Sequence, residues 1–336
     1  MTAEERNQPT ESRAKSVARR VFEHENAVLS IILVVIIVVL GIITNGLSAS
    51  PTNIKNILIQ SSVRGVAAMG QLFVILTGGI DLSVGGIAIF SSVLGASLIT
   101  QNPDLSIISS PIAVGAAVTL MLLLGLGLGI FNGTFVSYIG VPPLIVTLAM
   151  WQIAKGGGYQ VCKGASIISL PESMAFFGLG KVAGVPVPVI IFIAVAAVSY
   201  FVLNHSTFGR SVYAVGGSPT GAWLSGISVN KIRLSTYAIS GILAGLSALL
   251  MTSRTMSASM YTAAGLELDS ITAVVLGGVS LAGGRGNLIG GVIGVLILGV
   301  INNGMNIAGI DPSYQEMARG AIILAAVTAD VIRRRK

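Results

Sequence analysis

Seven polar side chains within or beside strongly apolar stretches are the best candidates in this chain for contact with a solute. They are amides, hydroxyls and one carboxylate: Gln71, Thr77, Asp81, Ser83, Asn132, Asn302 and Asn303. Amides and hydroxyls donate and accept hydrogen bonds, as a polyhydroxylated solute requires. Because polar groups are costly at membrane depth, we interpret this set as a candidate translocation pathway. The same groups can equally bond to neighbouring helices, and the sequence alone leaves both roles open.

Asp81 lies in a glycine-rich run, Leu76–Gly86, whose Gly-Gly-aliphatic-polar-Leu pattern recurs in Leu276–Gly286. Paired glycines with short polar side chains are typical of a broken helix or a tight turn, where freed backbone groups must face protein or water. We therefore expect broken or tightly turned segments near 77–86 and 277–286, and their likeness suggests an internal duplication. Asp81 either stabilises its turn by accepting backbone N–H bonds or shapes a gate, and we favour the first role.

The chain lacks the residue sets that covalent chemistry or nucleotide binding requires. It has no Gly-x4-Gly-Lys-Ser/Thr phosphate loop and no His-Glu-x-x-His motif, and its only histidines are His24 and His205. Cys162 is the only cysteine, which excludes an internal disulfide and a thiol-based metal cluster. We expect no enzyme activity, no metal site and no cofactor on this chain, with ATP and magnesium on a partner ATPase.

Three classes of function are compatible with these absences. Transport powered by a separate ATPase is the leading class. A secondary transporter or channel that works without an ATPase is its rival, and solute movement by the purified chain down an ion gradient would favour it. A membrane enzyme or scaffold comes third, because no convergent nucleophile, base and metal set is found.

Membrane-spanning helices are the elements that must position the polar residues. The chain is 53% hydrophobic and only 10% charged, with 42 glycines, unlike any soluble domain of this length. A helix needs about 20 mostly apolar residues to cross the hydrocarbon. We expect an all-α integral membrane protein with about ten spans, near residues 27–46, 55–76, 83–100, 111–137, 142–161, 186–203, 234–253, 269–282, 288–306 and 314–332.

Charge predicts the orientation of these spans. Residues 1–26 form a polar tail, 27–332 a single transmembrane domain and 333–336 a basic end. An even number of spans places both ends and the 204–233 loop on one side. That side carries thirteen basic residues against four on the other, as is typical of a cytoplasmic side. We interpret the net charge of +7 as a topology signal and expect no nucleic-acid partner.

The polar 204–233 loop contains a sequence typical of a very short helix. Ser218 is a good N-cap, Pro219 suits the first helical position and Gly226 a helix end. The expected helix also contains Thr220 and ends on the apolar pair Trp223 and Leu224. No neighbouring part of the sequence would cover these two side chains. This helix is either a docking element for a partner or a turn that folds its tryptophan into the bilayer interface.

Glycines at four-residue spacing predict close helix packing, because small residues let helix backbones approach. Such runs put a smooth stripe on one helix face, and we interpret them mainly as structural and only weakly as a subunit interface. The glycines concerned are Gly125, Gly129 and Gly133; Gly241 and Gly245; and Gly286, Gly290 and Gly294.

Over nearly its whole length the chain resembles the permease subunits of ribose-type ABC importers, a bacterial family that handles ribose, xylose, galactose, rhamnose and autoinducer-2. The resemblance covers the run Leu76–Gly85, Phe208–Arg210 through Leu224–Ile227, Glu267–Asp269 with Gly277-Gly278 and Gly283-Gly284, and Asn302–Gly304.

The resemblance implies a monosaccharide permease in the bacterial cell (inner) membrane, paired with a second permease copy or a homologue. It also implies a cytoplasmic ATPase, usually with two fused nucleotide-binding domains, and a periplasmic or lipid-anchored sugar-binding protein. In such permeases the segment equivalent to 209–233 contacts the ATPase, which favours docking by Ser218–Gly226. Family members often show Gly-Asn and then Glu-Ala-Ala where this chain has Gly216-Gly217 and Thr220-Gly221-Ala222. The missing negative charge bears on which ATPase this helix fits.

Overall fold

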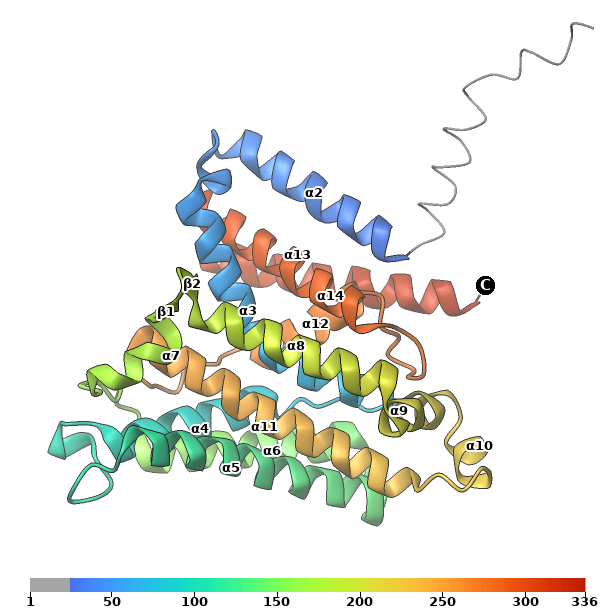
Figure 1. Ribbon diagram of the computed structural model, residues 1–336, viewed down its shortest axis with the longest axis horizontal. Helices are drawn as coiled ribbons and strands as arrows, with labels where there is room; N and C mark the ends of the chain where they lie inside the picture. The colour runs from blue at the N-terminus through green and yellow to red at the C-terminus, as the bar shows by residue number, and fades with distance from the viewer. Residues whose placement is uncertain (1–24, 336) are drawn as a thin grey trace, which may run out of the picture.

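The computed structural model describes residues 25–335, which form a bundle of helices (Figure 1). Ten helices overlap the expected spans: α2 (Glu25–Ile43), α3 (Pro51–Leu76), α4 (Val84–Ile99), α5 (Val114–Thr134), α6 (Pro143–Cys162), α8 (Val187–His205), α11 (Val229–Thr255), α12 (Leu266–Leu276), α13 (Leu288–Ile307) and α14 (Pro312–Arg335). Helix α12 departs most from its expected bounds, because it has only 11 residues and ends at Leu276 instead of 282. That all ten cross the membrane stays a prediction. Most of the expected polar tail lies outside the described residues.

Shorter elements connect these helices. They are α7 (Ala175–Leu179), α9 (Thr207–Gly217) and α10 (Pro219–Leu224), the 3-10 turns η1 (Leu47–Ala49), η2 (Pro103–Leu105) and η4 (Glu172–Met174), the π-helical turn η3 (Phe135–Ile139), and the strands β1 (Lys181–Val182) and β2 (Val185–Pro186). The antiparallel β1–β2 hairpin, with Lys181 paired to Pro186, is a small exception to the expected all-α fold. Helix α9 is a second addition, because only α10 is expected within the 204–233 segment.

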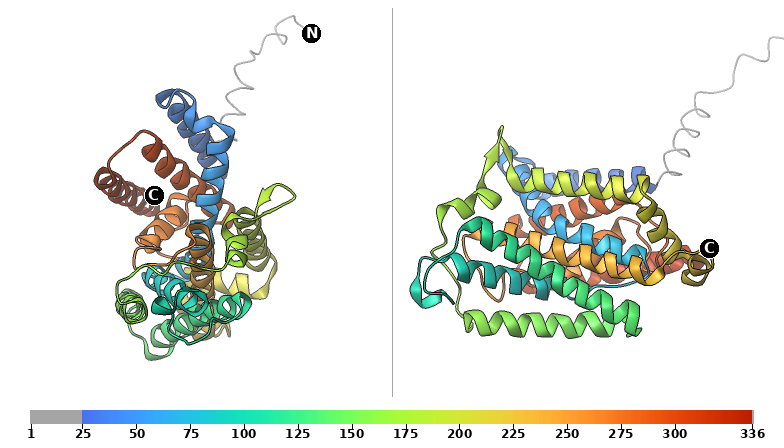
Figure 2. Two further views of the ribbon diagram at one scale, coloured as in Figure 1. Left: turned by 90° about the vertical axis from the view of Figure 1, so that its left-hand side faces the viewer. Right: turned by 60° about the horizontal axis from the view of Figure 1, so that its bottom comes forward.

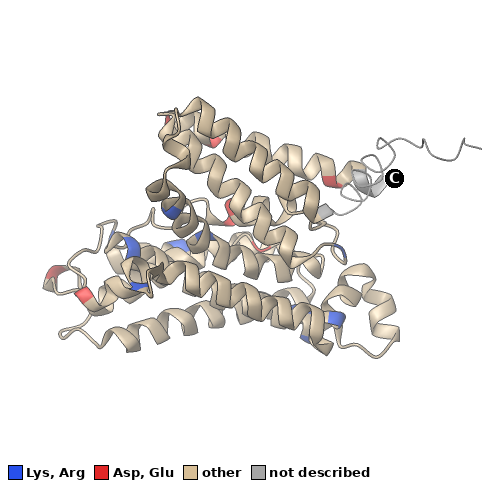
Figure 3. Ribbon diagram, turned by 45° about the horizontal axis from the view of Figure 1, so that its top comes forward, with Lys and Arg blue, Asp and Glu red and all other residues tan. Residues whose placement is uncertain are grey.

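The composition of the helices indicates an integral membrane protein. Within the described chain, six segments are long and apolar enough to cross a membrane: Asn26–Ile43, Pro51–Leu76, Val114–Ile139, Val187–His205, Val229–Thr255 and Leu288–Ile307. Figure 3 shows that most of the helical length carries no charged residue.

The two described ends of the chain and the α9–α10 pair lie at the same end of the bundle, at the right of Figure 1. The loop after α4 and the β1–β2 hairpin lie at the opposite end, and α5, α6, α8 and α11 run in the same general direction between them (Figure 2). This grouping agrees with the expectation that the two ends of the membrane domain and the 204–233 segment lie on the same side. That this side is cytoplasmic stays a prediction from charge.

Helix α11 is the centre of the bundle and packs against α5, α3 and α4. Its contact with α5 depends on glycine: a Cβ at Gly125 would overlap the carbonyl of Gly241, and one at Gly129 would overlap the carbonyl of Tyr237. Gly133 approaches the backbone of Leu234 in the same way. At these three glycines the backbones of α5 and α11 are in direct contact, so the two helices pack more closely than larger side chains would allow.

The expected stripe on α13 is shorter than the sequence pattern suggests. Gly290 and Gly294 do pack on α12, against the backbones of Gly277 and Ala273. Gly286, however, precedes α13 and lies in the turn with φ +126°, packed on Val279. Gly286 therefore does not belong to the face of α13, although it fits the four-residue spacing, because the helix begins only at Leu288.

Both glycine-rich runs open with the same helix C-cap. Gly78 has φ +77° and Gly278 has φ +86°, the left-handed conformation that glycine adopts most easily. After each, the next residue donates its N–H to a carbonyl five residues back, Gly79 to Val74 at 3.1 Å and Val279 to Val274 at 3.2 Å. These bonds define the Schellman motif. The repeated sequence thus has a local structural cause.

Beyond the cap, the two runs take different paths. Residues 277–287 form a tight turn, because the helices they join, α12 and α13, pack against each other. Residues 77–83 instead cross the interior of the bundle, because α4 packs mainly against α6, α11 and α5. Residues 77–83 are thus a buried break between helices, and residues 277–287 are a turn within a helical hairpin.

Candidate functional site

Helix α10 has the caps that its sequence predicts. Ser218 Oγ accepts a hydrogen bond from the Gly221 N–H at 3.0 Å, and Pro219 occupies the first helical position. Gly226 follows the helix with φ +80°. These local features cap the short helix at both ends.

The apolar pair on α10 points away from the bundle. Trp223 and Leu224 are 67% and 73% exposed, whereas Ala222, beside them in the sequence, is buried. Thr220 is exposed as well. Two large apolar side chains presented together at one end of the molecule are typical of an interaction site.

Helix α9 joins α10 to the body of the bundle. It begins where Ser206 Oγ accepts a hydrogen bond from the Gly209 N–H at 3.0 Å, and it buries Val212 and Val215 completely. Contacts of α9 with α8, α10, α11 and α3 hold it firmly at the end of the bundle. A partner that binds α10 would therefore act on the bundle through α9 and through α11, which follows α10 in the chain and also contacts it.

Asp81 is fully buried in the 77–83 crossing and its carboxylate is well bonded. Oδ1 accepts hydrogen bonds from the Ser83 N–H (2.9 Å) and hydroxyl (2.5 Å), and Oδ2 accepts one from the Ser240 hydroxyl of α11 (2.7 Å). Asn132 of α5 in turn donates to Ser83 Oγ at 2.8 Å. The Asp81 carboxylate thus ties the crossing to α11, and the Ser83 hydroxyl ties it to α5.

Gln71 and Thr77 complete this network from α3. With its amide oriented to match its partners, Gln71 donates to the Asp81 carbonyl at 3.0 Å and accepts from the Asp81 N–H at 3.1 Å. The Thr77 hydroxyl donates to the Val74 carbonyl of its own helix at 2.8 Å. Both side chains are at most 2% exposed, so their hydrogen bonds are used on the backbone around the break.

Asn302 and Asn303 are neighbours in sequence but have separate surroundings. Asn303 forms a reciprocal amide pair with Asn53 of α3, with bonds of 2.8 and 3.0 Å. Asn302 is 5% exposed, and neither its side-chain nitrogen nor its oxygen has a hydrogen-bond partner within the described chain. The hydroxyl of Ser61 is also buried, with no partner among the described residues.

Asn302 and Ser61 line a small cavity. Arg64 and Asp269 line it as well, and its volume is about 20 Å³, enough for one water molecule. Arg64 Nε lies 3.5 Å from Asp269 Oδ2, with the Arg64 side chain 40% and the Asp269 side chain 5% exposed. Donors, acceptors and a charged pair therefore meet between α3, α12 and α13.

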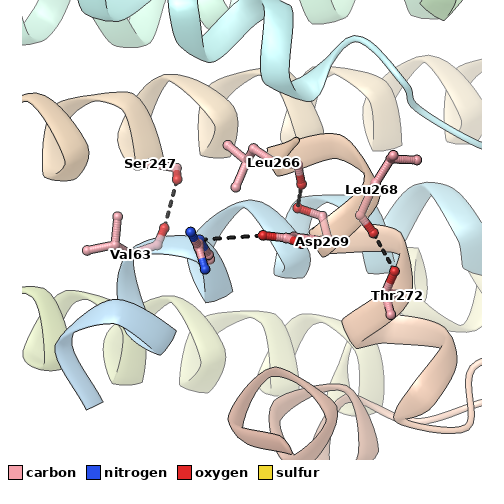
Figure 4. A network of polar contacts seen from close by, with 8 residues as sticks. Val63, Ser247, Leu266, Leu268, Asp269 and Thr272 are labelled. Carbon is pink, nitrogen blue, oxygen red and sulfur yellow. Dashed lines mark hydrogen bonds and ion pairs between the residues drawn. The ribbon is translucent and has the colours of Figure 1, made fainter. Parts of the chain in front are cut away.

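Figure 4 shows how the surrounding backbone supports this ion pair. Asp269 lies on the first turns of α12, where the Thr272 hydroxyl donates to the Leu268 carbonyl at 2.6 Å. On α3, the carbonyl of Val63 accepts a hydrogen bond from the Ser247 hydroxyl of α11 at 2.7 Å. Both partners of the ion pair are thus held on helices fixed by neighbouring hydrogen bonds.

A further charged cluster could not be expected from the candidate residues of the sequence. Lys155 Nζ lies 4.6 Å from the ring centroid of Trp151 on α6, and the adjacent glycines Gly85 and Gly86 of α4 pack against Glu267 of α12 and the backbone of Trp151 respectively. Glu267 Oε2 is buried, has no hydrogen-bond partner within the described chain and lies against Gly85. The signals in the sequence are a lysine inside the apolar 142–161 stretch and the Glu267–Asp269 motif of the resemblance.

The structure therefore separates the seven predicted pathway residues into three groups. Gln71, Asp81, Ser83 and Asn132 belong to one buried network with Thr77 beside it, Asn303 belongs to an interhelical pair, and Asn302 faces a cavity. Of the seven, all within the described chain, only Asn302 has free hydrogen-bonding capacity on both side-chain atoms.

Comparison with known proteins gives a consistent relationship. Residues 53–327 match the family model described as the permease component of branched-chain amino acid transport systems. The chain is 39% identical over 297 residues to a ribose import permease of Bacillus subtilis, covering 88% of this chain and 89% of that protein. It is 36% identical to a D-allose transport system permease of Escherichia coli over 301 residues, 89% of each chain. No solved structure matches.

A fructose import permease of Rhizobium meliloti is 35% identical over 315 residues, which cover 90% of this chain and 84% of that protein. The family model covers most of the described bundle, and the relatives extend over nearly the full length. The chain therefore belongs to the transport-system permease family that includes the ribose, allose and fructose import permeases of bacteria.

Proposed function

We propose that this chain is the transmembrane permease subunit of an ABC importer that moves a monosaccharide, ribose-like or related, across the bacterial inner membrane. ATP is hydrolysed on a separate cytoplasmic subunit. The observation that carries the proposal is the exposed Trp223–Leu224 pair on a capped helix, at the end of an apolar bundle whose relatives are sugar import permeases. Such a pair suits a groove on an ATPase.

The proposed mechanism uses rigid-body motion and no covalent step. Nucleotide-dependent movement of the ATPase displaces α10, and the helix bundle rocks between inward-open and outward-open arrangements. A sugar-binding protein, periplasmic or lipid-anchored, delivers the solute to the opposite side. The basic 204–233 segment and the ends of the chain then face the cytoplasm, as the positive-inside asymmetry predicts.

A second permease copy or a homologue completes the route in this proposal. Lys155 and Glu267 are only half-buried on helices of a membrane bundle, and charged side chains rarely face lipid. A partner permease that covers this face, with an aqueous passage between the two, would keep both groups out of hydrocarbon. The exposed apolar side chains Leu144, Leu148 and Ile153 on α6 suit the same interface or the surrounding lipid.

Within the proposed pathway set, we divide the roles by hydrogen bonding. The saturated bonds of Asp81, Ser83 and Asn303 favour a structural role that keeps helices in register, whereas the free amide of Asn302 favours solute contact. Thr77 and Gln71 go with the structural group, and so does Asn132 through its bond to Ser83, although its Oδ1 has no hydrogen-bond partner among the described residues. Specificity for a particular sugar is expected largely in the binding protein.

The test is transport by the reconstituted complex. Proteoliposomes should contain this chain with the ATPase subunit on the inside, and the sugar-binding protein should be added outside. They should accumulate labelled ribose, or a related pentose or hexose, only when ATP is supplied on the side of the ATPase. Uptake by the chain alone along a sodium or proton gradient would instead favour the secondary-transporter class.

A further inference from the structure

Three glycine segments that are distant in the sequence meet at the end of the bundle that carries α10. They are Leu76–Gly79 after α3, Ala282–Gly284 in the turn after α12, and Gly216–Gly217 at the end of α9. We call this meeting point the glycine junction. Through α9, the junction connects α10, the helix proposed to bind the ATPase, with both glycine-rich runs.

Backbone contacts hold the junction together. The Gly284 N–H donates a hydrogen bond to the Leu76 carbonyl at 2.9 Å. Gly216 lies so close to this bond that a Cβ there would overlap both the Leu76 oxygen and the Gly284 nitrogen. A Cβ at Gly283 would come within 2.7 Å of the Gly78 nitrogen. Space for even one methyl group is therefore lacking where the three segments touch.

Side chains extend the junction to further helices. The Tyr213 hydroxyl of α9 donates to the Gly286 carbonyl at 3.1 Å, and burial raises the pKa of Tyr213 above its ordinary value. The Leu281 N–H donates to Asp330 Oδ2 of α14 at 3.3 Å. The 277–287 turn is thus bonded to α9, α3 and α14 at once.

We propose that the glycine junction is the mechanical link between α10 and the membrane helices, with Gly216 and Gly284 as its positioning residues. Movement of α9 is passed through direct backbone contact to the ends of α3 and α12, because no flexible side chain lies between these described segments to absorb it. The inference rests on the proposed function, since it assumes that an ATPase moves α10. It assigns a role to Gly216, which stands where the resemblance leads one to expect the glycine of a Gly-Asn pair.

The chain offers a matched pair of variants. Gly216→Ala places a methyl group into the contact, whereas a Cβ at Gly217 meets nothing within 4 Å. Both changes add the same atoms to the same helix end. Gly217→Ala should therefore behave like the wild type, and any effect confined to Gly216→Ala reports on the junction.

The experiment uses the full chain reconstituted with its ATPase subunit and sugar-binding protein. In Gly216→Ala, the ratio of sugar transported to ATP hydrolysed should fall by roughly 5- to 150-fold, the range of free-energy coupling between linked sites. ATPase co-purification should persist, because Trp223 and Leu224 are untouched. A merely structural role would instead lower thermal stability and complex yield without changing that ratio in the surviving complex.

Tyr213→Phe provides a second variant that preserves packing. Loss of its single hydrogen bond to the 277–287 turn should lower the ratio of sugar transported to ATP hydrolysed by about two- to tenfold. If Gly216→Ala does not fold, Tyr213→Phe tests the role of the glycine junction in its place. A wild-type transport ratio in folded Gly216→Ala, or in Tyr213→Phe when the first variant misfolds, overturns the inference. If the wild-type complex itself shows no ATP-dependent uptake, the proposed function fails instead.

Discussion

Removing the apolar pair of α10 should separate the permease from its ATPase. In the double variant Trp223→Ala with Leu224→Ala, the bundle should remain folded, because both side chains are mostly exposed, 67% and 73%. Full burial of a large apolar side chain contributes about 1.5–3 kcal/mol. Scaled by these exposed fractions, the pair contributes about 2–4 kcal/mol when covered by a partner. The dissociation constant should therefore rise by about 30- to 1000-fold.

The assay measures ATPase binding and sugar uptake side by side, with thermal stability in detergent as the control for folding. A matched control lies on another short helix, α7, where Phe176 and Leu179 are 51% and 56% exposed at the opposite end of the bundle. Phe176→Ala with Leu179→Ala should leave ATPase binding unchanged. Undiminished ATPase binding and full uptake in the α10 variant would refute the docking role and return α10 to an interfacial turn.

The topology and the buried polar residues lead to three further predictions. Cysteines introduced as Thr220→Cys and Arg334→Cys should be labelled only from the cytosol and Asp311→Cys only from outside, and the reverse pattern for Thr220 and Asp311 would overturn the orientation. Asp81→Ala should reduce folded, dimeric permease and leave sugar preference unchanged, because it leaves buried donors unpaired at about 1–3 kcal/mol each; normal assembly with an altered preference would contradict this. Asn303→Leu should lower the melting temperature through loss of its Asn53 pair, whereas Asn302→Leu should lower uptake with little loss of stability; the opposite pattern would exchange their roles.

The helices were predictable because apolar length and capping residues are local signals. The pattern Ser218-Pro219 with Gly226 predicts α10, and the structure has the corresponding cap bonds. Helix α9 was missed although Ser206 is a good N-cap, because its glycines and polar residues suggest a loop. The expected helical stripe through Gly286 was wrong, since spacing does not reveal where a helix begins.

The partners of the buried polar residues could not be predicted. Asp81 bonds to Ser240, 159 positions away, and Asn53 bonds to Asn303, 250 positions away. Such contacts depend on which helices are neighbours, and apolar periodicity carries no such information for helices that are apolar nearly all round. The glycine junction is harder still to foresee, because glycine has no side chain whose chemistry indicates a partner.

The likeness of the two glycine-rich runs is a further case in which sequence was informative but ambiguous. The Gly-Gly signal correctly predicts two interruptions of helix, and both are Schellman caps. Whether the chain then turns back or crosses the bundle depends on residues 80–83 and their buried bonds to α11 and α5.

The most direct test of the proposed function is ATP-dependent sugar uptake measured together with ATP hydrolysis in proteoliposomes. Wild-type permease with its ATPase subunit and binding protein should hydrolyse ATP faster when the sugar-loaded binding protein is present, and should accumulate the sugar in step. The α10 double variant in the same membranes should show neither response. Sugar accumulation that persists without ATPase or ATP, or equal uptake by the wild type and the double variant, would contradict the central claim that ATP-driven motion enters this permease through α10.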